Sequence, residues 1–318
     1  MKKYLVTGGA GFIGVNLVKS LLVQGHSVRV IDNLATGSLC NVMPFLNDIE
    51  FIEGDIRDLQ TLSRIMKSID VVLHQAALPS VPRSIVDPLA SNDVNVTGSL
   101  NVLVAARDAG VRRVVIASSS SVYGDSSLLP KTETMPANPL SPYAVSKLAV
   151  EQYCHIFTQI YGLPTVVLRY FNVFGPHQDP NSQYSAVIPK FIMMMLRGEP
   201  PLIHGNGHQT RDFTYVDNVV SANLLASETD HDISGCFNVA SGERVSLLQL
   251  VAKLNQIVGT SLSPEHKEIR TGDVEHSQGN IDKICMGLGY EPKVKFDEGL
   301  RQTVDFFRTS VFEAKFHD

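Results

Sequence analysis

The chain has 318 residues, 44% of them hydrophobic and 19% charged, with a formal net charge of −5 at pH 7. This length can bury a large core and suggests two domains, or one large domain with an appended lobe. The lack of a basic run argues against nucleic acid as a partner. No apolar run approaches the roughly 18 residues of a membrane span, and the N-terminal stretch has no cleavage site, so we expect a cytoplasmic protein with no membrane partner. Scattered histidines and four distant cysteines predict neither a metal site nor disulfides.

Short apolar runs rich in valine and isoleucine alternate with stretches of helical spacing through the first half of the chain. The expected strands lie at 4–8, 27–32, 49–55, 70–76, 112–118 and 164–171. The expected helices between them lie at 11–25, 58–68, 87–110 and from Pro142 onward. Because the strands contain apolar residues at nearly every position, both of their faces should be buried. The alternation therefore predicts an α/β fold, a Rossmann-type doubly wound parallel sheet.

The pattern loosens after residue 175, where loops rich in proline and glycine separate the apolar segments. Helices are expected near 184–197, 216–228 and 246–258, and the run 236–242 is expected to return to the sheet as a further strand. We expect residues 1–175, with a returning segment at about 214–242, to form a dinucleotide-binding Rossmann domain. Residues 176–213 and 243–318 are then expected to form a smaller C-terminal substrate-binding lobe.

The segment VTGGAGFIG places three glycines directly after the first predicted strand and at the start of a helix. At Gly8, Gly11 and Gly14 a dinucleotide pyrophosphate can approach the backbone and meet the helix N-terminus. A tight turn alone would also explain them, but Asp32 follows at close to the spacing of about 20 residues expected for a carboxylate that accepts hydrogen bonds from an adenosine ribose. Such a carboxylate repels a 2′-phosphate, which favours NAD over NADP. Asp55, at the end of the third strand, is placed to reach the adenine edge or to cap the next helix.

The segment SPYAVSK places a phenol and an ammonium one helical turn apart. Pro142 suits the first turn of a helix, so Tyr143 and Lys147 should share one helix face. A free tyrosine has a pKa of about 10, and a cation within roughly 4–6 Å lowers that pKa. The pair is a candidate acid/base, although an ordinary aromatic beside a solvated lysine is the commoner meaning of so short a motif.

The motifs TGGAGFIG, GDIRD, HQAA, SSSSVYGD and YAVSK occur in this order, and RYFNVFGP, RDFTYVDN and RTGDVEHS follow them. In this combination, over essentially the whole chain, the sequence resembles the extended short-chain dehydrogenase/reductase family. The resemblance implies that Tyr143 is the catalytic acid/base and that Lys147 lowers its pKa and bonds the nicotinamide ribose. It also implies that Ser119 shares the hydrogen bond of the substrate hydroxyl, with Ser120 as the alternative within the serine run.

The same resemblance implies a set of binding residues for NAD and for a nucleotide sugar. The implied NAD contacts are Gly8, Gly11, Phe12, Ile13, Gly14, Asp32, Asn33, Asp55, Ile56, Gln75, Ala76, Ala77, Asn95, Tyr143, Lys147 and Tyr170. The implied substrate contacts are Ser80, Ser119, Ser120, Asn172, Ala186, Val187, Arg211, Arg270, Asp273 and Ser277. Among these, Asn172, Arg211 and Arg270 would reach the diphosphate, and Asp273 would hold the uridine ribose. Members of the family usually dimerise through the helices near 91–109 and 142–161, so a homodimer is expected.

The serine run indicates which reaction the resemblance favours. Family members that eliminate water or carbon dioxide carry a carboxylate just after the position of Ser119, whereas this chain has Ser120, Ser121 and Val122 there. What remains is removal and return of a hydride at C4 of a UDP-sugar, which is 4-epimerisation. The motifs are most similar to those of UDP-N-acetylhexosamine 4-epimerases, which act on UDP-N-acetylglucosamine and UDP-N-acetylgalactosamine.

Two positions bear on the choice of sugar. Ser277 leaves space for a 2-acetamido group, whereas a tyrosine at this position in hexose-restricted epimerases fills that space. Pro79 stands where this branch often has glycine and could shift the preference toward UDP-glucose and UDP-galactose. A UDP-glucuronate 4-epimerase is an alternative, but such enzymes tend to carry an arginine in place of Asp179, and two carboxylates would repel each other. Two further alternatives are a nucleotide-sugar oxidoreductase that exchanges its cofactor and an NAD sensor without catalytic activity.

Overall fold

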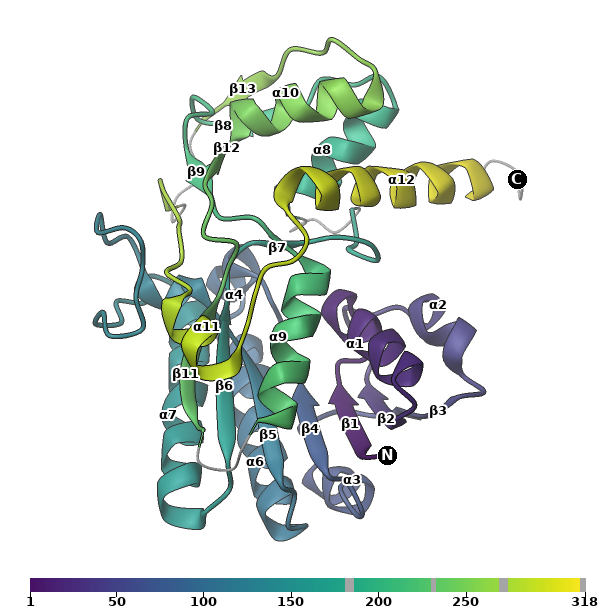
Figure 1. Cartoon of the computed structure of the whole chain (residues 1–318), viewed down its shortest axis with the longest axis vertical. Coiled ribbons are helices and arrows are strands. Elements are labelled where there is room, and N and C mark those ends of the chain that lie inside the picture. The colour runs from purple at the N-terminus through teal and green to yellow at the C-terminus, as the bar shows by residue number, and fades with distance from the viewer. Residues whose placement is uncertain (181–185, 230–232, 269–273, 315–318) are drawn as a thin grey trace.

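The computed structural model describes residues 1–180, 186–229, 233–268 and 274–314, the last five of these as backbone only. A seven-stranded parallel sheet with helices on both faces forms the larger part of the molecule, and a smaller lobe lies at one end of it (Figure 1). The strands in spatial order are β11 (Gly235–Val239), β6 (Thr165–Tyr170), β5 (Arg113–Ser119), β4 (Val71–His74), β1 (Lys3–Thr7), β2 (Ser27–Asp32) and β3 (Ile49–Glu53). The predicted doubly wound fold is confirmed.

Two apolar layers sandwich the sheet, as the nearly continuous apolar runs of its strands require. In β1, Tyr4 and Val6 pack into one layer and Leu5 into the other. The first layer is closed by α1 (Phe12–Val23), α9 (Val216–Glu228) and α11 (Asp282–Leu288). The second layer is closed by α3 (Leu59–Ile65), α6 (Ser99–Asp108) and α7 (Pro142–Tyr161). Short helical turns lie in the connections between these strands and helices: α2 (Leu39–Val42), η1 (Met43–Phe45), α4 (Val81–Val86), α5 (Pro88–Asn92) and η3 (Ser120–Tyr123).

The segment predicted as one helix over 87–110 is broken in the middle. A π-helical turn, η2 (Asp93–Gly98), lies between α5 and α6. Packing explains the glycine at the end of this turn, because a Cβ at Gly98 would lie only 2.6 Å from Cδ1 of Ile56. The wider turn brings buried Asn95 under the loop that follows β4, where its Oδ1 accepts a hydrogen bond from the Leu78 amide at 2.8 Å.

The smaller lobe has its own apolar core. It contains α8 (Val187–Leu196), α10 (Leu247–Val258) and α12 (Phe296–Ala314), and an aromatic cluster joins Phe174, Phe213 and Phe296. Three two-stranded sheets complete it: β7 (Val173–Phe174) with β10 (Thr214–Tyr215), β9 (Thr210–Arg211) with β12 (Val245–Ser246), and β8 (Leu202–His204) with β13 (Glu265–Lys267). Among the described residues, no helix combines the length and the apolar character needed to cross a bilayer.

Candidate active site

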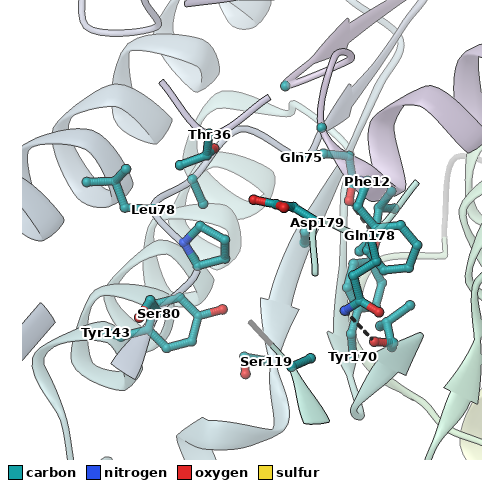
Figure 2. Close-up of a pocket in the computed structure, with 18 of the residues that line it drawn as sticks. Phe12, Thr36, Gln75, Leu78, Ser80, Ser119, Tyr143, Tyr170, Gln178 and Asp179 are labelled. Atoms are coloured by element: carbon teal, nitrogen blue, oxygen red, sulfur yellow. Dashed lines mark hydrogen bonds between the residues drawn. The ribbon is translucent and has the colours of Figure 1, made fainter. Parts of the chain in front are cut away.

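A cavity of about 2050 Å³ lies where the sheet meets the smaller lobe, beyond the carboxyl ends of the parallel strands (Figure 2). Chain order reverses at this place, because β4 lies on one side of β1 and β2 on the other. Ligands of doubly wound sheets bind at such a switch point. Since a site for one drug-sized ligand usually has about 300–1,000 Å³, this cavity has room for a dinucleotide and a second ligand together.

The glycine-rich turn between β1 and α1 forms one wall of the cavity. Gly8 has a φ of +68°, and a Cβ on it would lie 2.7 Å from the Ala76 amide nitrogen. A Cβ on Gly14 would overlap the carbonyl oxygen of Gly8. Helix α1 begins after Gly11 with no side-chain cap and no acidic residue in its first turn. Its free amide groups can therefore take an anion, which fits the pyrophosphate of a dinucleotide.

Asp32 ends β2 at the edge of the cavity, and its side chain is fixed from both sides. One carboxylate oxygen accepts a hydrogen bond from the Ala10 amide at 2.9 Å and the other from the Leu34 amide at 2.8 Å. Burial raises the pKa of this carboxyl group, and the two amides oppose that rise. Each oxygen keeps a lone pair, so the group can still accept hydrogen bonds from ribose hydroxyls.

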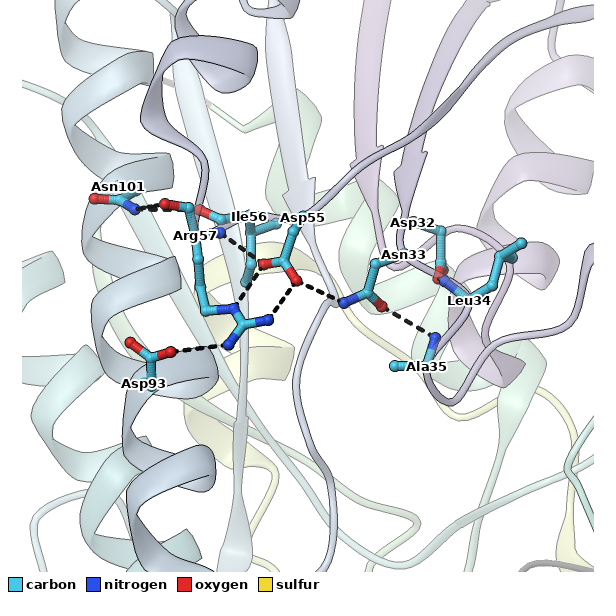
Figure 3. Close-up of polar contacts among 9 residues, drawn as sticks. All are labelled: Asp32, Asn33, Leu34, Ala35, Asp55, Ile56, Arg57, Asp93 and Asn101. Atoms are coloured by element: carbon cyan, nitrogen blue, oxygen red, sulfur yellow. Dashed lines mark hydrogen bonds and ion pairs between the residues drawn. The ribbon is translucent and has the colours of Figure 1, made fainter.

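Asp55 does not line the cavity, although the sequence predicted that its side chain could reach the adenine edge of the cofactor. Its carboxylate accepts two hydrogen bonds from the Arg57 guanidinium, at 2.8 and 3.0 Å, and one from Asn33 at 2.8 Å (Figure 3). These contacts, the one with Arg57 foremost, lower its pKa to about 2. Arg57 also bonds Asp93 at 2.9 Å. Asn33, Ile56 and Arg57 line the cavity. Asp55 therefore acts indirectly, because it holds the side chains of Asn33 and Arg57 in place.

Tyr143 and Lys147 come from the first turns of α7, whose start and end follow from local sequence. Ser141 caps the helix by accepting a hydrogen bond from the Ala144 amide at 3.2 Å, and Gly162 ends it with a φ of +67°. Both of these side chains line the cavity, and Ser119 at the end of β5 lies opposite the phenol (Figure 2). The Lys147 ammonium lies 5.9 Å from the centroid of the Tyr143 ring and donates to the Ala117 carbonyl at 2.9 Å.

The predicted lowering of the Tyr143 pKa by Lys147 is not found in the chain itself. Burial raises the pKa of the phenol to about 12, and a hydrogen-bonding interaction with Ser119 opposes that rise. Burial also lowers the pKa of Lys147 to about 8, which Glu151 and Cys154 oppose. The physical reason is that both groups are desolvated, and the ammonium is directed to a backbone carbonyl instead of the phenol oxygen.

The other expected NAD contacts divide into two groups. Phe12, Ile13, Gln75, Ala76, Ala77 and Tyr170 line the cavity. The Tyr170 hydroxyl donates to Gln75 at 3.2 Å and accepts a hydrogen bond from the Asn223 side-chain nitrogen at 2.8 Å, which fixes the cavity wall. Asn95 does not line the cavity, because its amide group is bonded to Leu78 and to Ser146. Its effect on a cofactor would come through the loop that it holds.

On the substrate side, the structure brings together most of the expected residues. Those that line the cavity are Ser80, Ser119, Ser120, Asn172, Ala186, Arg211 and Ser277. Val187 begins α8 and does not line it, and Arg270 and Asp273 lie outside the described residues. Asn172 has a φ of +22°, rare for a residue with a side chain, and its amide contacts the Asp212 carbonyl at 3.3 Å and Ser277 at 3.4 Å. Backbone strain of this kind is common at functional sites.

Several cavity residues were not singled out by the sequence patterns. Thr36, Gly37 and Ser38 form a loop after β2, and Asn41 of the short helix α2 that follows holds this segment in place by donating to the Ala10 carbonyl at 2.8 Å. The small residues that follow Asp32 were the available signal for this loop. At the far side, His177, Gln178 and Pro180, which flank the singled-out Asp179, and the pair Phe306 and Phe307 of α12 approach the cavity, and the sequence carries no local sign of that. The strand order, the glycine turn and the cavity define a dinucleotide-binding protein of the Rossmann class.

Comparison with known proteins narrows this class. A family model described as the NAD dependent epimerase/dehydratase family matches residues 4–240. UDP-glucose 4-epimerase of Mycolicibacterium smegmatis is 39% identical over 308 residues, which cover 96% of this chain and 98% of that protein. The chain therefore belongs to the NAD dependent epimerase/dehydratase family. The predicted resemblance to extended short-chain dehydrogenases/reductases and the prediction of NAD as the cofactor are confirmed.

Two solved structures show the same fold over nearly the whole chain. UDP-N-acetylglucosamine 4-epimerase from Methanobrevibacter ruminantium M1, in complex with UDP-N-acetylmuramic acid, is 40% identical with a TM-score of 0.93, covering 97% of this chain and 99% of that one. UDP-glucose 4-epimerase of Thermus thermophilus, in complex with NAD, is 39% identical with a TM-score of 0.88, covering 96% and 99%.

Proposed function

We propose that this protein is an NAD-dependent 4-epimerase of UDP-sugars, acting on UDP-N-acetylglucosamine and UDP-N-acetylgalactosamine and also on UDP-glucose and UDP-galactose. The observation that carries the proposal is the meeting of Tyr143, Lys147 and Ser119 in one cavity with room for two ligands. Among the described residues that line it, the only carboxylates are Asp32, on the adenosine side, and Asp179. The serine run offers no second acid/base beside Ser119, which disfavours elimination and decarboxylation.

The chain's own residues account for the proton chemistry. Ser119 fixes the oxygen of the C4 hydroxyl, and Tyr143 takes its proton and later returns it. Lys147 places a positive charge beside Tyr143, which favours the phenolate, the form that can accept this proton. When bound, NAD supplies the acceptor and donor of the hydride and brings the positive charge of its oxidised ring, which favours the phenolate that the protein alone disfavours.

The substrate-side residues suit an intermediate that must turn over without leaving. Arg211 lies at the cavity wall, and its guanidinium is held by the Thr210 and Glu275 carbonyls, both at 3.0 Å. A guanidinium fixed in this way can bind a diphosphate in a defined place. Anchoring the nucleotide there, with Asn172 beside it, would leave the sugar free to present either face to the cofactor.

Two side chains support the choice of a neutral sugar. Ser277 contributes a small side chain to the cavity near Asn172, which leaves space for a 2-acetamido group. The Asp179 carboxylate extends into the cavity from the side opposite Tyr143 (Figure 2). Asp179 is exposed at the cavity, and a uronate would bring a second carboxylate beside it, where like charges repel, so UDP-glucuronate is disfavoured.

Replacing Ser277 with tyrosine is expected to reduce kcat/KM for UDP-N-acetylglucosamine by at least about tenfold while changing that for UDP-glucose by less than about threefold. The reason is steric, because the larger ring would occupy the space of the acetamido group. Ser277→Ala is the matched control, which removes the hydroxyl without filling the pocket. Equal losses on both sugars would show that Ser277 does not set the pocket size.

The proposed activity is tested by incubating the purified protein, without added cofactor, with UDP-N-acetylglucosamine and separately with UDP-glucose. Proton NMR follows the sugar, and absorbance follows NADH. We expect the galacto epimers to form without accumulation of NADH. Accumulating NADH would instead indicate an oxidoreductase that exchanges its cofactor, and no conversion of either sugar would overturn the proposal.

We also propose that residues 1–175 with 214–242 form the NAD-binding domain, and that 176–213 and 243–318 form the nucleotide-sugar-binding lobe. The apolar core that α8, α10 and α12 share supports this division, while Phe174 and Tyr215 pack into that core from the first domain and α11 packs against the sheet.

A homodimer is the assembly that we propose. The exposed apolar side chains of α4, α5 and α7 support it, among them Val86, Leu89 and Ile160, which are 78%, 81% and 67% exposed. Light scattering at micromolar concentration should give the mass of two chains, and the mass of one chain would contradict the proposal.

A further inference from the structure

A buried ion pair lies beside the catalytic pair but outside the cavity. Arg169 of β6 donates to Glu151 of α7 through two nitrogens, Nε to Oε1 at 2.9 Å and Nη2 to Oε2 at 2.6 Å. The two side chains are only 8% and 5% exposed. Neither residue lines the cavity, so neither is placed to touch cofactor or substrate. Burying two charges is costly, and apolar side chains often replace such a pair without loss of stability, so stability alone explains it poorly.

The ion pair is bonded to the strand end that carries the serine of the site. Ser118 lies beside Arg169 in the register of β5 and β6, and its hydroxyl donates to Glu151 Oε1 at 2.5 Å. The next residue is Ser119, which faces Tyr143. The preceding residue is Ala117, whose carbonyl accepts the hydrogen bond from Lys147. Glu151 therefore holds the middle one of three consecutive residues, and the outer two contact the catalytic pair.

Glu151 also lies on the same face of α7 as the catalytic pair, because positions 143, 147 and 151 are each four residues apart. We propose that Glu151, held by Arg169, is a positioning residue of the reaction: it fixes the end of β5 and supplies the negative charge that keeps Lys147 protonated beside Tyr143. This inference rests on the proposed epimerase function and names a residue that acts only through others.

The charged and titratable groups around Lys147 leave Glu151 as its source of negative charge. From α7 they are Tyr143, Glu151 and Cys154, and from β4 His74. Burial lowers the pKa of His74 to about 3 and raises that of the Cys154 thiol, so both are neutral at physiological pH.

The ionisable groups that face Glu151 from other strands leave it as the source of negative charge for Lys147. They are Arg169 of β6, which pairs with Glu151, and Cys236 of β11, whose thiol pKa burial raises to about 12. Among the described residues, Glu151 is thus the carboxylate that raises the pKa of Lys147 against the effect of burial.

The test is the pH dependence of kcat in Glu151→Gln, which keeps the shape of the side chain and removes its charge. Tyr143 and Lys147 titrate as a coupled pair, so the profile reports an apparent pKa of the pair. We expect that apparent pKa to fall by about one unit and the highest kcat to fall at least about tenfold, while KM changes less than about threefold. A profile that coincides with that of the wild type would overturn the inference.

Two further variants separate charge from geometry and from folding. Ser118→Ala removes the hydrogen bond but no charge, so kcat should fall several-fold with the apparent pKa unchanged within a few tenths of a unit. Glu151→Leu combined with Arg169→Met removes both charges and leaves none unpaired. It should fold even if Glu151→Gln does not, and it should still show the lowered apparent pKa. A wild-type pKa in this double variant would also overturn the inference.

A readout independent of turnover completes the experiment. NMR titration of protein labelled at the tyrosine ¹³Cζ, with Tyr143→Phe to assign the signal, should show the altered titration of Tyr143 in Glu151→Gln. If the wild type does not epimerise UDP-sugars but the titration shift is present, the proposed function fails and the electrostatic role of Glu151 stands. If the wild type epimerises and the titration is unchanged, only the role of Glu151 fails.

Discussion

Replacing Tyr143 with phenylalanine should lower kcat for UDP-sugar epimerisation by about 10²- to 10⁴-fold, the range expected when a general acid/base is removed. The ring remains on the buried face of α7, and the hydroxyl that is lost interacts with Ser119 within the cavity. No partner elsewhere in the described core is left unsatisfied, so thermal stability should change little. The variant should copurify with as much NAD as the wild type, because the glycine turn is untouched.

The matched control for this prediction is Tyr215→Phe. Its hydroxyl is also in a largely buried setting and donates to Gln302 at 2.7 Å, but the residue does not line the cavity. It should lose about 1 kcal/mol of stability and keep most of its kcat. If Tyr143→Phe retains more than a few per cent of wild-type kcat, Tyr143 is not the group that exchanges a proton with the C4 hydroxyl.

The sheet and its switch point could be predicted because their signals are local in the sequence. Each strand is a short run of valine and isoleucine, and the run 27–32 matches β2 residue for residue. The glycines that open α1 and the Tyr143 and Lys147 spacing are fixed by a single turn or a single helix. Once helices alternate with buried strands, the strand order and the place of the cavity follow from the rules of doubly wound sheets.

What could not be predicted depends on partners that are distant in sequence. The orientation of Asp55 is set in part by Asn33, and that of Asn95 by Leu78 and Ser146. The sign of the Tyr143 pKa shift depends on burial by the whole cavity wall, which a four-residue motif does not reveal. Helix α12 was missed although Leu300, Val304 and Phe307 already have helical spacing and are buried.

Asp212 illustrates the same limit within a recognised motif. The sequence marked the segment RDFTYVDN, yet nothing local shows that this carboxylate is fully buried. It accepts hydrogen bonds from the amide and hydroxyl of Ser241, at 2.8 and 2.7 Å, and from the amides of Gly242 and Gly279, both at 3.1 Å. Burial raises its pKa to about 6 against these four donors. The segment that brings Ser277 to the cavity is thereby bonded to the end of the sheet.

Replacing Gly14 with alanine should abolish copurification of NAD and weaken NAD binding by at least about 100-fold, or about 3 kcal/mol. The added Cβ would overlap the carbonyl oxygen of Gly8, which is backbone and cannot rotate away. The turn must therefore open, and the amide groups that face the pyrophosphate move with it. Overpacking of this kind costs about 1–3 kcal/mol, so the fold itself should persist. Isothermal titration with NAD measures the affinity, and thermal unfolding without NAD measures the stability.

Gly11→Ala provides the graded comparison on the same turn. A Cβ on Gly11 would lie 3.2 Å from the Gly8 carbonyl oxygen, a tight contact that a shift of a few tenths of an ångström relieves. Its NAD affinity should therefore fall much less than that of Gly14→Ala, although both residues line the cavity. Because Gly14 has no positive φ, the difference cannot come from backbone strain and must come from the approach of α1 to the turn. Wild-type NAD affinity in Gly14→Ala would mean that the cofactor does not depend on this close contact.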